Sequence, residues 1–139
     1  MTKKAIVLDA NILIRAVLGM RVRELVATYS HEVQFFAPDV AYADARKYLP
    51  TLLEKRGIPP EPAMAVLDSL APIIQVIDAE IYVAVKVAAL QRIGSRDEDD
   101  WPVLACAIVV GCPVWTEDAD FFGTGVATWT TDRVELYFA

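Results

Sequence analysis

Several residue types and signatures on which common protein classes depend are scarce in this 139-residue sequence. The two cysteines, Cys106 and Cys112, are six positions apart, a spacing that fits neither a disulfide framework nor a CxxC metal or redox motif. The single histidine, His31, lies in a polar segment with no matching catalytic partners, so a triad mechanism is not indicated. We therefore predict packed thiols in a reducing cytoplasm and a surface histidine.

The motifs of several large enzyme classes are also missing. There is no GxSxG, no GxGxxG after a predicted strand and no GxxxxGK[ST], so acyl transfer at a nucleophile elbow, dinucleotide binding and P-loop chemistry lack their usual signals. The longest apolar runs, such as residues 103–110, are far shorter than the roughly 20 residues that cross a bilayer. We expect no membrane anchor and no signal peptide.

Positive charge is the third scarcity. Thirteen lysines and arginines stand against 19 aspartates and glutamates, which gives a net charge of −6. This sign opposes contact with phosphate, which normally needs basic side chains. The objection weakens if the acidic residues converge on one site, because bound cations would then make that site attractive to phosphate.

Strand-like and helix-like segments alternate along the whole chain. The pattern predicts strands at residues 5–8, 33–37, 73–77, 113–116, 126–130 and 135–138. It predicts helices at residues 11–18, 22–29, 39–56, 63–70, 79–92 and 97–111, with Asp39 as an N-cap. This alternation predicts an α/β fold, with residues 1–139 as a single domain whose mainly parallel sheet of about five strands has helices on both faces.

Aspartates gather just beyond the predicted strands. In open α/β sheets, ligands bind outside the carboxyl ends of the strands. The residues at such positions are Asp9, Asp44, Asp97, Asp100, Asp118 and Asp120. Each alone could be a helix cap or a solvated side chain. If several meet at one edge, their repulsion requires cations or protons, and capping becomes the poorer explanation.

Clustered carboxylates without histidine or cysteine provide hard oxygen ligands. Such ligands suit Mg²⁺ or Mn²⁺ and do not suit zinc. Two such ions roughly 4 Å apart can activate a water molecule and stabilise the leaving oxygen in an in-line displacement at phosphorus. The sequence therefore indicates phosphate chemistry.

Two blocks of the sequence resemble the PIN-domain family. Residues 6–13 (IVLDANIL) resemble the opening strand and helix, in which an Asp is followed two places later by Thr, Ser or Asn. Residues 100–107 (DWPVLACA) and 113–121 (PVWTEDADF) resemble the second half, with an Asp, an Ala-rich helix, a strand and Thr-x-Asp-x-Asp-Phe. The resemblance covers nearly the whole chain in the same order.

The resemblance implies a PIN-like fold and a metal-dependent ribonuclease. The acidic quartet that would bind metal and catalyse is Asp9, Asp44, Asp100 and Asp118. Asn11 and Thr116 would support it, and Asp97 and Asp120 would be auxiliary ligands or caps. Asp44 departs from the family pattern, in which Glu is common, and its shorter side chain bears on metal geometry.

Contacts with RNA are indicated more weakly. Arg15, Arg46 and Arg96 lie on segments that could surround the acidic site, and Trp101 could stack on a base. Solvated helix faces are the simpler explanation for most of the arginines, and core packing is the simpler explanation for the tryptophan. These four residues are candidates for RNA binding.

The resemblance also implies partners. Many small members of the family are VapC-like toxins of toxin-antitoxin pairs, which form homodimers and are held inactive by an antitoxin protein. One alternative is a catalytically silent PIN fold that acts as an RNA-binding or protein-interaction module. Another is a phosphatase of the haloacid dehalogenase type, which would need a second Asp where this chain has Asn11.

Overall fold

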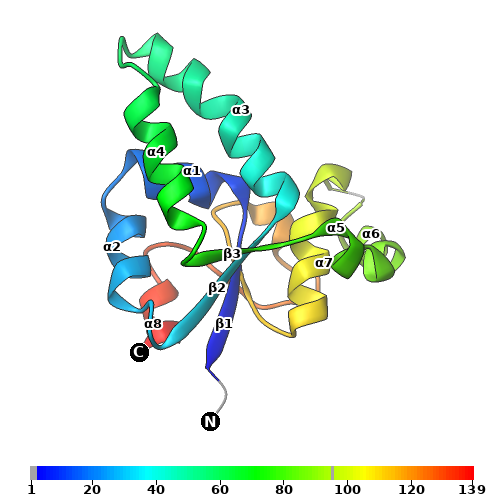
Figure 1. Ribbon diagram of the computed structural model, residues 1–139. Coiled ribbons are helices and arrows are strands. Elements are labelled where there is room, and N and C mark those ends of the chain that lie inside the picture. Colours follow the sequence, from blue (N-terminus) through cyan, green and yellow to red (C-terminus); the bar gives the residue numbers. More distant parts are fainter. Residues whose placement is uncertain (1–2, 95) are drawn as a thin grey trace.

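A parallel sheet forms the centre of the computed structural model, which describes residues 3–94 and 96–139 (Figure 1). Its strands are β1 (Lys4–Leu8), β2 (Val33–Pro38), β3 (Ile74–Ile77), β4 (Val114–Trp115) and β5 (Thr128–Trp129). The sheet has five strands in the order β3-β2-β1-β4-β5, and all of its pairings are parallel. The predicted α/β fold with a parallel sheet of about five strands is confirmed.

The central strand β1 is buried on both faces. Ile6 and Leu8 belong to one apolar core and Val7 to the other, and all three side chains are fully buried. Because successive side chains of a strand point to opposite faces, such a run needs helices on both sides of the sheet.

Helices supply those two layers (Figure 1). The first core is completed by α1 (Ala10–Leu18), α2 (Arg21–Thr28), α3 (Asp39–Lys55), α4 (Glu61–Leu70) and α8 (Val134–Phe138). The second is completed by α5 (Ala79–Tyr82), α6 (Lys86–Ile93) and α7 (Trp101–Val110). Short 3₁₀ helices, η1 (Val83–Val85), η2 (Glu98–Asp100) and η3 (Ala119–Phe121), lie between the longer elements.

The prediction of a strand at residues 135–138 is wrong, because this segment belongs to helix α8. Val134 and Phe138, four residues apart, are both buried, which is the spacing of one helix face. Phe138 packs against Phe35 and Trp115 with ring centroids 5.6 Å apart in both pairs. These partners are distant in the sequence, so the local pattern could not show them.

The predicted helix at residues 79–92 is found as a helical segment, but it is not one regular α-helix. The structure divides it into α5, the 3₁₀ helix η1 and α6. The segment contains Val83, Val85 and Val87, whose β-branched side chains disfavour an uninterrupted helix.

Asp39 is not the N-cap of α3, contrary to the prediction. It is the first residue of the helix, and Pro38 occupies the N-cap position. The Asp39 carboxylate instead accepts hydrogen bonds from the backbone N–H of Ala79 (3.1 Å) and the hydroxyl of Tyr82 (2.6 Å). The side chain therefore connects the start of α3 to α5.

Both thiols are free, as predicted, with Cys106 buried and Cys112 half-buried. Burial raises the pKa of each to about 12, so neither is a reactive thiolate at neutral pH. His31 is exposed, also as predicted. Across residues 3–94 and 96–139, no helix combines the length and the apolar character that crossing a membrane would require.

Candidate metal centre

The strand order reverses direction at β1. The chain adds β2 and then β3 on one side of β1, and later adds β4 and β5 on the other. At such a switch point the connections leave in opposite directions, and ligands bind outside the carboxyl ends of the strands there. Asp9 follows β1 directly and Thr116 follows β4 directly.

Asp9 is fixed by two hydrogen bonds. Its Oδ1 accepts from the backbone N–H of Ile12 at 2.9 Å, which makes Asp9 the N-cap of α1. Its Oδ2 accepts from the Thr116 hydroxyl. The residue is 7% exposed, and burial raises the pKa of its carboxyl, although both hydrogen bonds act in the opposite direction.

Thr116 connects Asp9 to the turn that carries two more aspartates. Its Oγ1 accepts from the backbone N–H of Asp118 at 2.9 Å, and the Asp118 carboxylate accepts from the N–H of Asp120 at 2.9 Å. Thr116 itself is fully buried. A buried hydroxyl thus sets the positions of groups on two adjacent strands.

A cleft of about 170 Å³ brings the predicted acidic residues together. Its polar lining contains the carboxylates of four predicted residues, one further aspartate and an amide: Asp9, Asp44, Asp100, Asp118, Asp99 and Asn11. Asp44 and Asn11 are exposed at the rim. Asp99 was not among the predicted site residues, although its place in the acidic run 97–100 was a visible signal.

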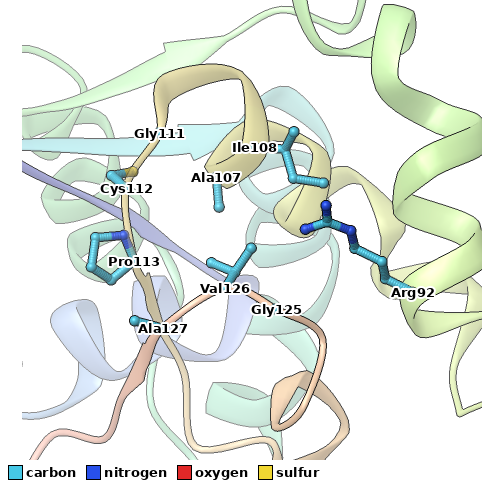
Figure 2. Close-up of a pocket in the computed structure, with 9 residues that line it drawn as sticks. All are labelled: Arg92, Ala107, Ile108, Gly111, Cys112, Pro113, Gly125, Val126 and Ala127. Carbon is cyan, nitrogen blue, oxygen red and sulfur yellow. The ribbon is translucent and has the colours of Figure 1, made fainter.

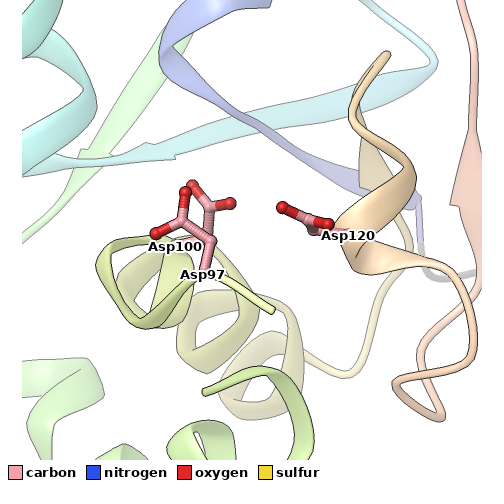
Figure 3. A group of neighbouring side chains, drawn as sticks. All are labelled: Asp97, Asp100 and Asp120. Atoms are coloured by element: carbon pink, nitrogen blue, oxygen red, sulfur yellow. The ribbon is translucent and has the colours of Figure 1, made fainter. Parts of the chain in front are cut away.

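Asp97, Asp100 and Asp120 form a second, overlapping cluster (Figure 3). One carboxylate oxygen from each lies within 4.8 Å of the others. Asp97 and Asp100 lie together beside η2, and the Asp120 carboxylate points toward them from η3 (Figure 3). Asp100 therefore belongs to both groups of carboxylates.

Asp100 is the carboxylate of the cleft whose surroundings most oppose a negative charge. Its Oδ2 is buried and has no hydrogen-bond partner among the described residues. Burial, followed by repulsion from Asp97, Asp118 and Asp9, raises the pKa of its carboxyl to about 7. Buried oxygens normally have a partner, so this all-oxygen donor set fits a hard divalent cation.

The three candidate RNA-binding arginines have partners within the protein. Arg46 pairs with Asp68 at 2.6 Å, and Arg15 lies 3.9 Å from Glu117. Arg96 donates to the backbone carbonyls of Asp120 (2.9 Å) and Phe122, so it holds the turn that carries Asp120. The fourth candidate, Trp101, is partly buried.

A larger cavity of about 390 Å³ lies where α7 ends, between that helix and the segment leading into β5 (Figure 2). Among the described residues that line it, Arg92 is the charged one, and the others are small or apolar. No Asp or Glu is among the described residues that line this cavity, so it does not share the carboxylates of the cleft at the carboxyl edge of the sheet.

A parallel α/β sheet with carboxylates converging at its switch point defines a class of domain suited to binding divalent cations. The family model of the PIN domain matches residues 7–139, and the chain belongs to the PIN-domain family. The resemblance of the two sequence blocks is thereby confirmed.

Solved structures share the fold at low sequence identity. PAE2754 from Pyrobaculum aerophilum has a TM-score of 0.72 and 12% identity, over 97% of this chain and 89% of that one. DNA-bound VapBC from Salmonella typhimurium has a TM-score of 0.64 and 21% identity, over 94% and 99%. VapBC-1 from nontypeable Haemophilus influenzae has a TM-score of 0.65 and 14% identity, over 93% and 99%. No curated protein matches the sequence.

Proposed function

We propose that this protein is a Mg²⁺- or Mn²⁺-dependent endoribonuclease. The observation that supports this most directly is the convergence of Asp9, Asp44, Asp100 and Asp118 on one cleft. They come from four separate segments, and the oxygen of Asp100 that has no partner among the described residues lies among them. Membership of the PIN-domain family supports the same function.

The buried carboxylates of the cleft would hold the cations. Asp9 is held by Ile12 and Thr116, so its carboxylate cannot rotate and would orient a bound cation. Asp100 and Asp118 would complete the ligand set, with Asp97 and Asp120 at its border. When bound, the cations would supply a nucleophilic water and stabilise charge on the leaving oxygen.

Asp44 and Asn11 have a different setting from the buried ligands. Both are exposed at the rim of the cleft, where they can contact water and substrate directly. Asp44 would reach a cation through its own carboxylate or through a bound water, because its side chain is short. Asn11 would hydrogen-bond a phosphate oxygen or the attacking water.

The net charge of −6 is compatible with a phosphate substrate only if the cleft is loaded with metal. Cations in the cleft would reverse the local potential where the carboxylates now dominate it. RNA binding should therefore depend on the divalent ion, more than it would for a protein with a basic surface.

We also propose an antitoxin partner and a homodimer. Two of the similar structures are VapBC proteins, and the sequence is 55% hydrophobic. Exposed apolar side chains such as Val87 (70%), Leu136 (70%) and Ile81 (53%) leave surface for such contacts. The free thiols suit a cytoplasmic location.

The first test is titration of Mn²⁺ and Mg²⁺ by calorimetry on the wild type and Asp9→Asn. The same samples are then incubated with a mixed pool of labelled RNAs. We expect the wild type to bind metal and cut RNA, and the variant to lose both, because its amide cannot replace an anionic ligand.

Asp78→Asn is the matched control. Asp78 also follows a strand, β3, but it does not line the cleft and its side chain makes no cap hydrogen bond. This variant should bind metal and cut RNA like the wild type. A wild type that binds no metal and cuts nothing would contradict the nuclease and favour the silent interaction module.

A further inference from the structure

Apart from the cavity at the end of α7, a second cavity adjoins the carboxylate cleft, on the side of α6. It has a volume of about 230 Å³ and is lined by Lys86, Leu90, Glu98, Asp99 and Trp101. Asp99 also lines the carboxylate cleft, so the two cavities share a wall. A group bound in this second cavity therefore lies next to the cleft.

The neighbouring helices hold Trp101 in a fixed orientation. Its ring packs against that of Tyr82 with centroids 5.5 Å apart and planes inclined by 63°. Tyr82 is 1% exposed, and its hydroxyl donates to Asp39. Trp101 itself is only partly buried, so one rigid aromatic ring supports another that remains accessible from the cavity.

Lys86 lies over this indole. Its Nζ is 5.0 Å from the centroid of the Trp101 ring, a cation–π contact at an exposed position. A lysine side chain is flexible, and an exposed contact of this kind is weak. A flat ligand could therefore replace the ammonium on the ring, while the ammonium moves to the edge of that ligand.

We propose that this cavity is a base-binding subsite in which one nucleobase of single-stranded RNA stacks on Trp101. That the ligand is RNA rests on the proposed nuclease function. The new element is where one base binds and which side chains recognise it. Stacking on an aromatic side chain strengthens binding by about tenfold or more per base. The shared wall at Asp99 would place this base close to the phosphate in the cleft.

The polar groups around the indole favour guanine. Its Watson–Crick edge presents two adjacent donors, N1–H and the N2 amino group, which match the carboxylates of Glu98 and Asp99. Its O6 and N7 acceptors match the Lys86 ammonium. Adenine and cytosine have an acceptor nitrogen beside their amino group, and uracil has acceptors on both sides of its one donor. The carboxylates would therefore repel part of the Watson–Crick edge of each of these three bases.

The first test uses 5′-mononucleotides as probes, because it needs no cleavage. GMP, AMP, CMP and UMP are titrated into the wild type while the indole N–H signals are followed by NMR. Trp101→Phe identifies the signal of Trp101. We expect GMP to shift that signal and, through its hydrogen-bonded edges, to bind about tenfold more tightly than the other three nucleotides.

Two substitutions test the lining. Lys86→Ala, on the exposed surface, should weaken GMP binding by about tenfold, and Trp101→Leu should abolish it. Lys55→Ala is the matched control for loss of a lysine, at the end of α3, and should bind GMP like the wild type. Equal affinity for all four nucleotides would overturn the guanine preference, and absence of binding would overturn the subsite.

The second test separates this proposal from the nuclease. Sequencing the ends of RNA fragments cut by the wild type should show guanine at a fixed distance from the cut. Lys86→Ala should lose this enrichment, with KM raised about tenfold and kcat retained. GMP binding without cleavage would keep the subsite and reject the nuclease; cleavage without GMP binding or guanine enrichment would do the reverse.

Discussion

Thr116 is the residue on which the acidic site depends most while contributing no charge. Its hydroxyl donates to Asp9 and accepts from the N–H of Asp118, and it is fully buried between strands β1 and β4. The sequence predicted Thr116 as a support of the site through the family resemblance. The hydrogen bonds that define this support came from the structure.

Thr116→Val tests this support, because valine keeps the shape and removes the hydroxyl. Asp9 then loses a donor and the Asp118 N–H loses an acceptor, so both carboxylates are less well oriented. We expect Mn²⁺ affinity to fall by about tenfold, as is typical when an outer-shell partner of a metal ligand is removed.

Calorimetry measures this loss of affinity, with Thr124→Val as the control. Thr124 is another buried threonine, and its hydroxyl donates to the carbonyl of Phe121. The Thr124→Val variant should lose stability without a comparable loss of metal affinity. Unchanged affinity in Thr116→Val would contradict the supporting role.

Asp100 makes the stability of the metal-free protein depend on pH. Burial raises the pKa of its carboxyl in the folded protein to about 7, from 3.8. The folded state then holds a proton between about pH 4 and 7 that the unfolded state has released, so the free energy of unfolding falls as pH rises through this window.

Asp100→Asn should remove this dependence, since an amide stays neutral. We expect the variant to be more stable than the wild type by about 1–2 kcal/mol at pH 8. This is well below the free energy that corresponds to the whole pKa shift, because the cleft is open to water. Near pH 4 the two should be equal. Urea denaturation in EDTA measures this; parallel pH curves would contradict it.

At the scale of elements, the short helix α5 is held to the start of α3 by a side chain. The Asp39 carboxylate accepts from Ala79 N–H and from the Tyr82 hydroxyl, and Tyr82 in turn supports Trp101. The sequence suggested a local cap at Asp39. The partners are about 40 residues away, a separation that no local pattern can show.

A double-mutant cycle of Asp39→Ala and Tyr82→Phe measures this connection. Tyr82→Phe should cost about 1 kcal/mol, and Asp39→Ala about 2–3 kcal/mol because it also leaves the Ala79 N–H without its acceptor. Both variants remove the same hydrogen bond. In urea denaturation the double variant should therefore lose less stability than the sum of the two single losses. Additive effects would show that the bond contributes nothing.

The turn that carries Asp120 depends on Arg96, which was a candidate for RNA binding. Arg96 donates to the carbonyls of Asp120 and Phe122. The turn also passes close to it at Gly123, where the φ of +82° favours glycine and an added Cβ would lie 3.3 Å from the guanidinium. The arginine therefore has a structural use that its charge alone did not reveal.

Arg96→Ala should release this turn and move Asp120 away from Asp97 and Asp100. We expect Mn²⁺ affinity to fall by about tenfold, by the same outer-shell effect. Arg92→Ala is the control, because the Arg92 guanidinium lies near the same loop, where a Cβ added to Gly125 would be 3.4 Å from it, but lines the cavity at the end of α7. Similar calorimetric titrations for the two variants would contradict this account.

At the scale of the whole molecule, the acidic site joins segments that are far apart in the sequence. Its carboxylates come from the end of β1, from α3, from η2 and from the turn after β4. Without a cation their repulsion opposes folding, whereas a bound cation would connect all four segments. Metal binding should therefore stabilise the entire fold.

Thermal denaturation at increasing Mn²⁺ measures this stabilisation. At a free Mn²⁺ concentration of 100 times the dissociation constant, the free energy of unfolding should rise by about 2.7 kcal/mol. At one fixed Mn²⁺ concentration the rise should be greatest at pH 8, where the carboxyl of Asp100 is ionised and Mn²⁺ binds more tightly, and absent in Asp9→Asn. A transition temperature that does not respond to Mn²⁺ would contradict the metal centre.

Much of the fold was predictable because it depends on local sequence. Apolar runs of strand length separated by helical periods determined the parallel α/β class, and Asp9, Asp100 and Asp118 could be placed at strand ends and helix starts. The short C-terminal helix was not predictable, since residues 134–138 pack on Phe35 and Trp115 and pair with Arg21 of α2, all distant in the sequence. Five residues carry too little periodicity to distinguish a strand from a helix.

The sequence by itself determined the order of the elements and the supply of carboxylates, because both follow from residue type and spacing. The tertiary structure decided which charges meet. It brought Asp99 into the cleft, directed Arg46 and Arg96 to partners within the protein, and placed Lys86 over Trp101. The reason is physical: side chains pair across distances that depend on how helices pack on the sheet, and that packing is set by the whole core.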